Sequence, residues 1–119
     1  MGRVCVAVPT DDGVKVKIGH FGDARYYYRY VLDEDGGWRL EGRVENPYAG
    51  LHERGSGEEE PVKRPKILEL IRGCTHIVAT AFGPGGQEFM EKHGLRVIRV
   101  KPGTTIQEAL HVVQENLKG

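Results

Sequence analysis

The sequence carries no excess charge of either sign and no long apolar run, and both shortages exclude classes of protein. Seventeen Lys and Arg residues balance seventeen Asp and Glu residues in a chain of 119, so no overall field draws it to nucleic acid or to an anionic membrane. No apolar stretch approaches the roughly 20 residues that cross a bilayer. The N-terminal VCVAV run is too short for the core of a signal peptide. We therefore expect no nucleic-acid or membrane partner, and a cytoplasmic protein.

Cysteine is also scarce. Cys5 and Cys74 belong to no C-x-x-C motif, which argues against a disulfide framework, a zinc ribbon and a thioredoxin-type site. Cys5 falls in an apolar strand and Cys74 at a helix–strand junction, where thiols are ordinarily buried and inert. We therefore interpret Cys5 as an inert core thiol in a reduced, cytoplasmic setting.

The overall amino-acid composition is that of one globular domain. Hydrophobic residues make up 39% and charged residues 29% of the chain, and its length allows a core without disulfides or a structural metal. We expect residues 1–119 to form a single domain. Residues 46–62 hold two prolines, three glycines and a run of three glutamates, so we predict a mobile loop there.

Alternating apolar residues predict three strands in the first part of the chain. Residues 4–8 are apolar on both faces, which is typical of a buried central strand. Strands at 25–33 and 38–45 are separated by the turn sequence DEDGG, which predicts an antiparallel hairpin.

From Lys63 onward the pattern changes to alternating helices and strands. A helix ending at Gly73 is followed by a strand at 76–81, a helix ending at Gly94 and a strand at 95–100. The last helix begins at Thr104 or Thr105 with a capping box. The order βββαβαβα predicts an α/β fold with a mixed five-stranded sheet and helices on its faces.

Four stretches together resemble a known family: HFGDARYY, ENPYAGLHERG, THIVATAFGPGGQEFMEKHGLRVIRV and GTTIQEAL. Over nearly its whole length the chain resembles the dinitrogenase iron–molybdenum cofactor biosynthesis family, of the NifX and NifB C-terminal type. The resemblance implies a ribonuclease H-like layer and a bound metal–sulfur cluster of iron–molybdenum or iron–sulfur type. It also implies that the histidine of His-Phe-Gly holds the cluster, and that cofactor-assembly or acceptor proteins are partners. We expect a monomer or weak homodimer.

His20 is the first candidate for a metal ligand. Neutral imidazole binds iron and related metals well, and the nearby Gly19 and Gly22 let the backbone approach a bulky group. The alternative is a turn residue with a solvated ring. His52, in the loop at 46–62, is the second candidate, and its alternative is an ordinary surface residue.

The sequence AFGPGG at 81–86 predicts a strand-to-helix turn that could bind an anion through backbone N–H groups. Gly83, Gly85 and Gly86 are therefore candidate cofactor-binding residues. The turn matches neither the Walker nor the G-x-G-x-x-G pattern, and its alternative is a tight connection that requires small residues. We expect it to meet His20 at the carboxyl ends of central strands.

Three functions remain open. The first is non-enzymatic binding or carrying of a metal–sulfur cluster, with no catalytic residue. The second is a metal-free protein–protein interaction module of the same fold. A nuclease ranks last, because two-metal hydrolysis requires carboxylates on the first strand, and VCVAV has none.

Overall fold

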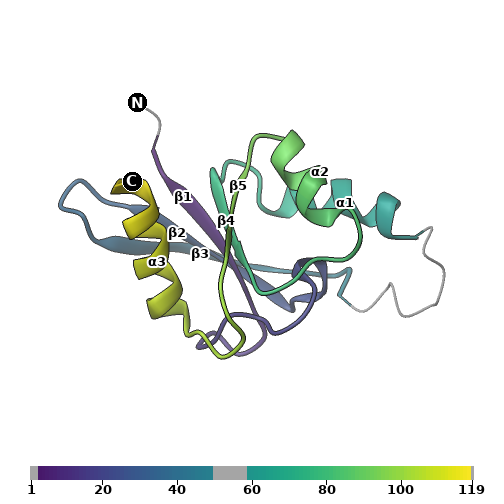
Figure 1. Cartoon of the computed structure of the whole chain (residues 1–119), viewed down its shortest axis with the longest axis horizontal. Coiled ribbons are helices and arrows are strands. Elements are labelled where there is room, and N and C mark those ends of the chain that lie inside the picture. The colour runs from purple at the N-terminus through teal and green to yellow at the C-terminus, as the bar shows by residue number, and fades with distance from the viewer. Residues whose placement is uncertain (1–2, 50–58, 119) are drawn as a thin grey trace.

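A computed structural model describes residues 3–49 and 59–118. Figure 1 shows its helices and strands. In chain order they are β1 (Cys5–Thr10), the short 3₁₀ helix η1 (Phe21–Asp23), β2 (Tyr26–Leu32), β3 (Trp38–Glu45), α1 (Glu59–Leu70), β4 (His76–Ala79), α2 (Gly86–Lys92), β5 (Arg96–Arg99) and α3 (Ile106–Lys118).

The strands form one mixed sheet in the order β3-β2-β1-β4-β5. Strand β1 lies at its centre, antiparallel to β2 and parallel to β4. All six of its residues are buried, as two apolar faces require of a central strand. The α/β class, the mixed five-stranded sheet and the central first strand are confirmed.

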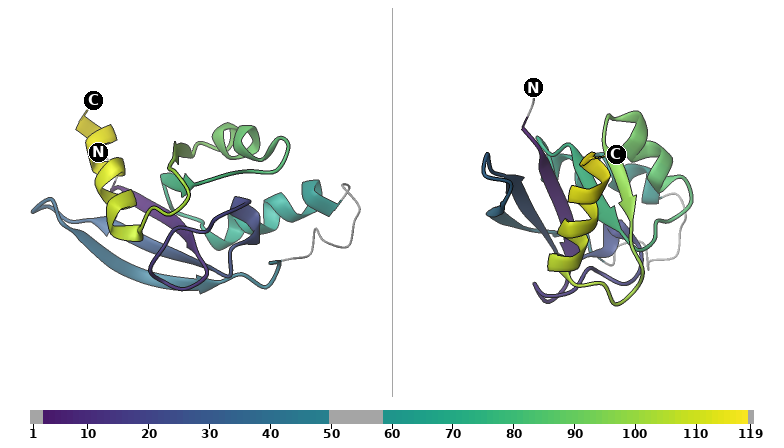
Figure 2. Two further views of the ribbon diagram at one scale, coloured as in Figure 1. Left: turned by 60° about the horizontal axis from the view of Figure 1, so that its bottom comes forward. Right: turned by 60° about the vertical axis from the view of Figure 1, so that its left-hand side comes forward.

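Helices cover both faces of this sheet, as predicted. Val6 and Val8 of β1 pack with Ile106, Leu110 and other residues of α3 on one face. Ala7 points to the other face, where it packs with residues of α1 and α2. Figures 1 and 2 show α3 well apart from α1 and α2. The alternation of side chains along β1 thus produces two separate cores.

The side chains of the tyrosine-rich strand β2 also alternate between the two cores. Tyr27 is fully buried in the core beneath α1, while Tyr28 and Tyr30 pack on the core beneath α3. The capping box of α3 is also confirmed. The Thr105 hydroxyl accepts from the Glu108 amide at 3.1 Å, and the Glu108 carboxylate accepts from the Thr105 amide at 3.0 Å.

Two predicted boundaries are wrong. Helix α1 begins at Glu59, so the predicted loop at 46–62 extends too far. Pro61 does not prevent this early start, because the first amides of a helix have no intrahelical partner to lose. Residues 50–58 lie outside the described residues. Strand β1 also continues through Pro9 to Thr10, and the Pro9 carbonyl accepts from the Lys17 amide at 2.8 Å.

Within the two described stretches, no helix is both long enough and apolar enough to span a bilayer.

Candidate functional site

A small cavity lies where the turn before β2, the start of α1 and the turn after β4 meet. Its volume is about 50 Å³, which is room for a few water molecules. A cluster of several metal atoms would therefore sit at its mouth. The lining residues are His20, Phe21, Gly22, Asp23, Lys63, Arg64, Ile67, Phe82, Gly83, Gly86 and Met90.

His20 is fixed at this cavity by its backbone. It forms an isolated parallel bridge with Ala81, just beyond the end of β4, and the next amide, of Phe21, donates to the Ala81 carbonyl at 3.0 Å. The side chain is 41% exposed, so a main chain held in place carries an accessible imidazole. The sequence prediction that His20 and the 81–86 turn meet at a strand end is confirmed.

The two glycines that flank His20 do different things. Gly19 has a φ of 119°, which side-chain-bearing residues rarely adopt, and its amide donates to the Thr80 hydroxyl at 3.0 Å. Gly22 has no positive φ, and a Cβ there would lie 3.6 Å from Lys63 Cε, an ordinary contact. Gly19 therefore permits the turn, whereas Gly22 leaves room at the cavity.

Two cations and one carboxylate surround the cavity. Lys63 Nζ donates to Asp23 Oδ1 at 2.8 Å, and both side chains are largely buried. The other Asp23 oxygen lies 3.9 Å from His20 Nδ1. Arg64 donates to the Pro84 carbonyl. Two positive groups against one negative group favour an anionic occupant.

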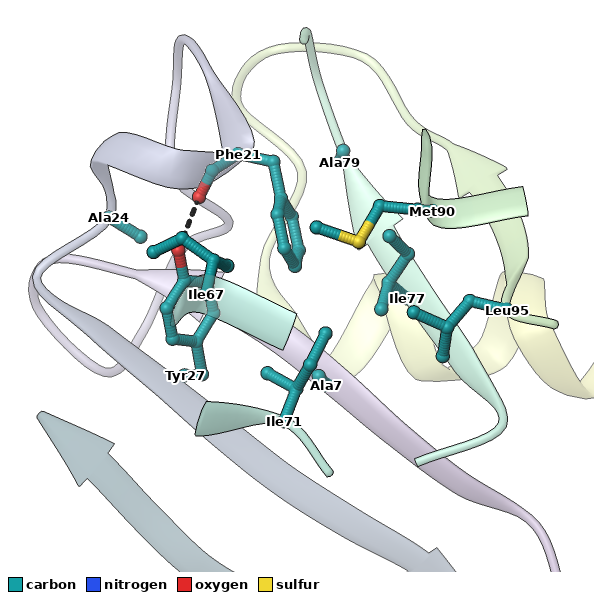
Figure 3. Packing of buried hydrophobic residues seen from close by; sticks show 10 residues of the cluster. All are labelled: Ala7, Phe21, Ala24, Tyr27, Ile67, Ile71, Ile77, Ala79, Met90 and Leu95. Atoms are coloured by element: carbon teal, nitrogen blue, oxygen red, sulfur yellow. Dashed lines mark hydrogen bonds between the residues drawn. The ribbon is translucent and has the colours of Figure 1, made fainter. Parts of the chain in front are cut away.

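The floor of the cavity is apolar and closely packed. Figure 3 shows the Phe21 ring directed toward the Met90 side chain, and the Tyr27 hydroxyl bonded to the Phe21 carbonyl. That hydrogen bond is 2.7 Å long, and the Phe21 and Phe82 rings stack with centroids 5.6 Å apart. Burial raises the pKa of the Tyr27 phenol, so Tyr27 stays a neutral donor. Below His20 the cavity is thus bounded by packed aromatic and apolar side chains.

The glycine turn contributes to the cavity wall only in part. Gly83 and Gly86 line the cavity, whereas Gly85 is exposed, lies outside that lining and has a φ of 77°. The Gly86 amide donates to the Gly83 carbonyl at 3.0 Å, so this N–H is used within the turn. A Cβ at Gly86 would come within 3.2 Å of the Phe82 ring. A side chain at this position would therefore require the Phe82 ring to shift by a few tenths of an ångström.

Seven of the lining residues were not predicted from the sequence as part of a site: Phe21, Asp23, Lys63, Arg64, Ile67, Phe82 and Met90. Asp23 stands three residues after His20 in the HFGD motif, and that spacing could have identified it. Nothing in the spacing links Lys63 to Asp23, which is 40 residues away. His52 lies outside the described residues. Within residues 3–49 and 59–118, no three His, Cys, Asp or Glu side chains gather as a metal site.

Comparisons with known proteins identify the family to which the chain is similar. The family model described as dinitrogenase iron–molybdenum cofactor matches residues 2–116. Protein NifY of Klebsiella pneumoniae is 27% identical over 117 residues, which are 98% of this chain. The match covers 47% of that protein, so the chain spans about half the length of its curated relative.

Solved structures share the fold. An NMR structure of a Thermotoga protein, provisionally named a NifB protein and placed in the DUF35 family, is 28% identical with a TM-score of 0.60. The match covers 97% of this chain and 89% of that one. A second structure, at 20% identity and a TM-score of 0.56, shows the fold alone.

Proposed function

We propose that this chain, which belongs to the dinitrogenase iron–molybdenum cofactor family, binds and carries a metal–sulfur cluster at the mouth of the His20 cavity. The family match indicates a role in the biosynthesis or handling of iron–molybdenum cofactor. The finer proposal is a non-enzymatic carrier whose cargo is a cluster of iron–molybdenum or iron–sulfur type. The observation that carries it is an accessible imidazole on a fixed backbone beside two cations.

His20 would be the metal ligand. Its Nδ1 faces the Asp23 carboxylate, so we assign Nε2 as the nitrogen that binds the cargo. A carboxylate on the far side of a ligating imidazole orients the ring and raises its basicity. One protein ligand at a partly open site gives a bond that can be exchanged, as transfer to another protein requires.

Lys63 and Arg64 would supply the positive charge that an anionic cluster requires. Metal–sulfur clusters are commonly anionic, and cations beside them offset that charge. Because the Gly86 amide is already bonded within the turn, we assign this role to the two side chains ahead of the backbone. Gly83 and Gly86 then provide space at the wall, and a contribution from Gly85 stays a prediction.

Several further parts of the proposal rest on the family. His52 would approach the same cargo from the segment that precedes α1. The partners would be cofactor-assembly or acceptor proteins in the cytoplasm, and the chain would act as a monomer or weak homodimer. The five-stranded mixed sheet supports a ribonuclease H-like classification of the layer.

Metal analysis and an absorption spectrum of protein isolated without oxygen test the proposal. We expect iron, with or without molybdenum, and sulfide-to-metal charge-transfer bands. Exposure to an apo acceptor protein should then remove the metal. Protein that is metal-free after isolation and after anaerobic treatment with ferrous iron and sulfide would favour the interaction module instead.

A further inference from the structure

Two cysteines that are 69 residues apart in the chain are in direct contact, one in β1 and the other in the turn that follows α1. The Sγ atoms of Cys5 and Cys74 lie 2.8 Å apart, and both residues are free thiols. The sequence interpretation of Cys5 as an inert core thiol did not include this contact. Cys5 is fully buried, as expected, and its sulfur lies against a second, partly exposed thiol.

Backbone hydrogen bonds hold both sulfurs in place. The Cys5 carbonyl accepts from the Thr75 amide at 2.8 Å, and the Cys5 amide donates to the Thr75 hydroxyl at 3.1 Å. Gly73, with a φ of 92°, turns the chain from α1 toward β4, and the Cys74 amide donates to the Ile71 carbonyl at 3.0 Å. Once one of two such neighbouring cysteines forms a mixed disulfide, the other attacks it far faster than a free thiol in solution would.

The chemistry of the pair favours a thiolate. The pKa of the Cys5 thiol is lowered to about 7, mainly because the Cys74 thiol donates a hydrogen bond to it. The same hydrogen bond, together with burial, raises the pKa of Cys74. The Arg29 guanidinium favours the thiolate at both sulfurs, and it is anchored to the Arg72 carbonyl at 2.7 Å. The pair therefore shares a single proton near neutral pH.

We propose that Cys5 and Cys74 are a redox switch that closes to an intramolecular disulfide on exchange with a small disulfide such as oxidised glutathione. Oxidised glutathione can reach only the partly exposed Cys74, so the reaction begins when the shared proton moves from Cys74 to the Cys5 thiolate. The Cys74 sulfur bonds to one sulfur of the glutathione disulfide, whose S–S bond breaks, and the first glutathione leaves with the proton from Cys5. The Cys5 thiolate then attacks Cys74 Sγ and releases the second glutathione, which takes a proton from solvent. Two protein thiols are oxidised and one small disulfide is reduced.

The disulfide would tie β1 to the end of α1, the helix that carries Lys63, Arg64 and Ile67 of the cavity lining. A cross-link over a loop of this length constrains the unfolded chain and stabilises the fold. The oxidised protein is therefore expected to melt several degrees higher than the reduced one. This switch requires no bound cluster, so its test is independent of the proposed function.

Treatment of the reduced protein with oxidised glutathione, followed by alkylation and intact-mass measurement, tests the switch. Wild type should lose two hydrogen atoms, resist alkylation at both cysteines and gain thermal stability that a dithiol reductant reverses. Cys5→Ser should stop at a glutathione adduct on Cys74, and Cys74→Ser should stay unmodified because Cys5 is buried. Cys5→Ala replaces Cys5→Ser if the hydroxyl prevents folding. A stable glutathione adduct on wild type, or two thiols that stay alkylatable, would overturn the proposal.

Discussion

Lys63 Nζ lies 2.8 Å from Asp23 Oδ1, and this ion pair joins helix α1 to the turn that carries His20. Only 9% of the Lys63 side chain and 16% of the Asp23 side chain are exposed. A pair this deep is weakly screened by solvent, and loss of one partner leaves the other buried without compensation. The position of the His20 imidazole therefore depends on Lys63, which lies 40 positions from Asp23 in the sequence.

We expect Lys63→Met to destabilise the protein by about 1–3 kcal/mol, because Asp23 loses its buried cationic partner. Lys92→Met, an exposed change at the end of α2, is the matched control and should leave the free energy of unfolding nearly unchanged. Urea denaturation of both variants measures the difference. Equal stability of the two would show that the Lys63–Asp23 pair contributes nothing to the fold.

The glycines beside His20 provide a second comparison. Gly19→Ala should cost about 1–3 kcal/mol, because a φ of 119° is strained for any residue with a Cβ. Gly22→Ala introduces a methyl group at ordinary contact distance from Lys63 and should cost much less. Thermal melts of the two variants give the order of stability. If Gly22→Ala were the more damaging change, the turn would not depend on Gly19 in this way.

The cysteine pair predicts a pH dependence. Ultraviolet absorbance of the thiolate in reduced protein should show one ionisation with a pKa of about 7, that of Cys5. Cys74→Ala removes the donated hydrogen bond, so the ionisation should move to higher pH. A wild-type protein with no thiolate below pH 8 would contradict the hydrogen bond between the two sulfurs.

The same ionisations determine how stability changes with pH. Between about pH 7 and the ordinary cysteine pKa of about 8.5, the folded pair binds one proton and the unfolded chain binds up to two. The contribution of the two thiols to the free energy of unfolding therefore rises with pH in that window. Above this window the unfolded chain has lost both thiol protons, whereas the folded state keeps one because the pKa of Cys74 is raised. The contribution of the two thiols to the free energy of unfolding therefore falls as the pH rises further. Denaturation of wild type and the Cys5→Ala, Cys74→Ala double variant across pH 6–10 isolates the effect.

The sheet was predictable because it is specified by sequence patterns within a few neighbouring residues. Alternation in β1 and β2 sends each side chain to one of two cores, and the turn at DEDGG fixes the pairing of β2 with β3. The meeting of His20 and the 81–86 turn followed from strand order alone. The cavity cations and the thiol pair were not predictable, since they join residues 40 and 69 positions apart through side-chain packing that no spacing records.

The affinity of the His20→Ala variant for an iron–sulfur cluster, reconstituted anaerobically from ferrous iron and sulfide, tests the central claim most directly. His111→Ala is the control, because His111 is an exposed histidine on α3, across the sheet from the cavity. We predict that His20→Ala weakens cluster binding by about tenfold or more, with a melting temperature of the apo protein close to that of wild type, while His111→Ala binds normally. Equal cluster affinity for the wild-type, His20→Ala and His111→Ala proteins would contradict the account.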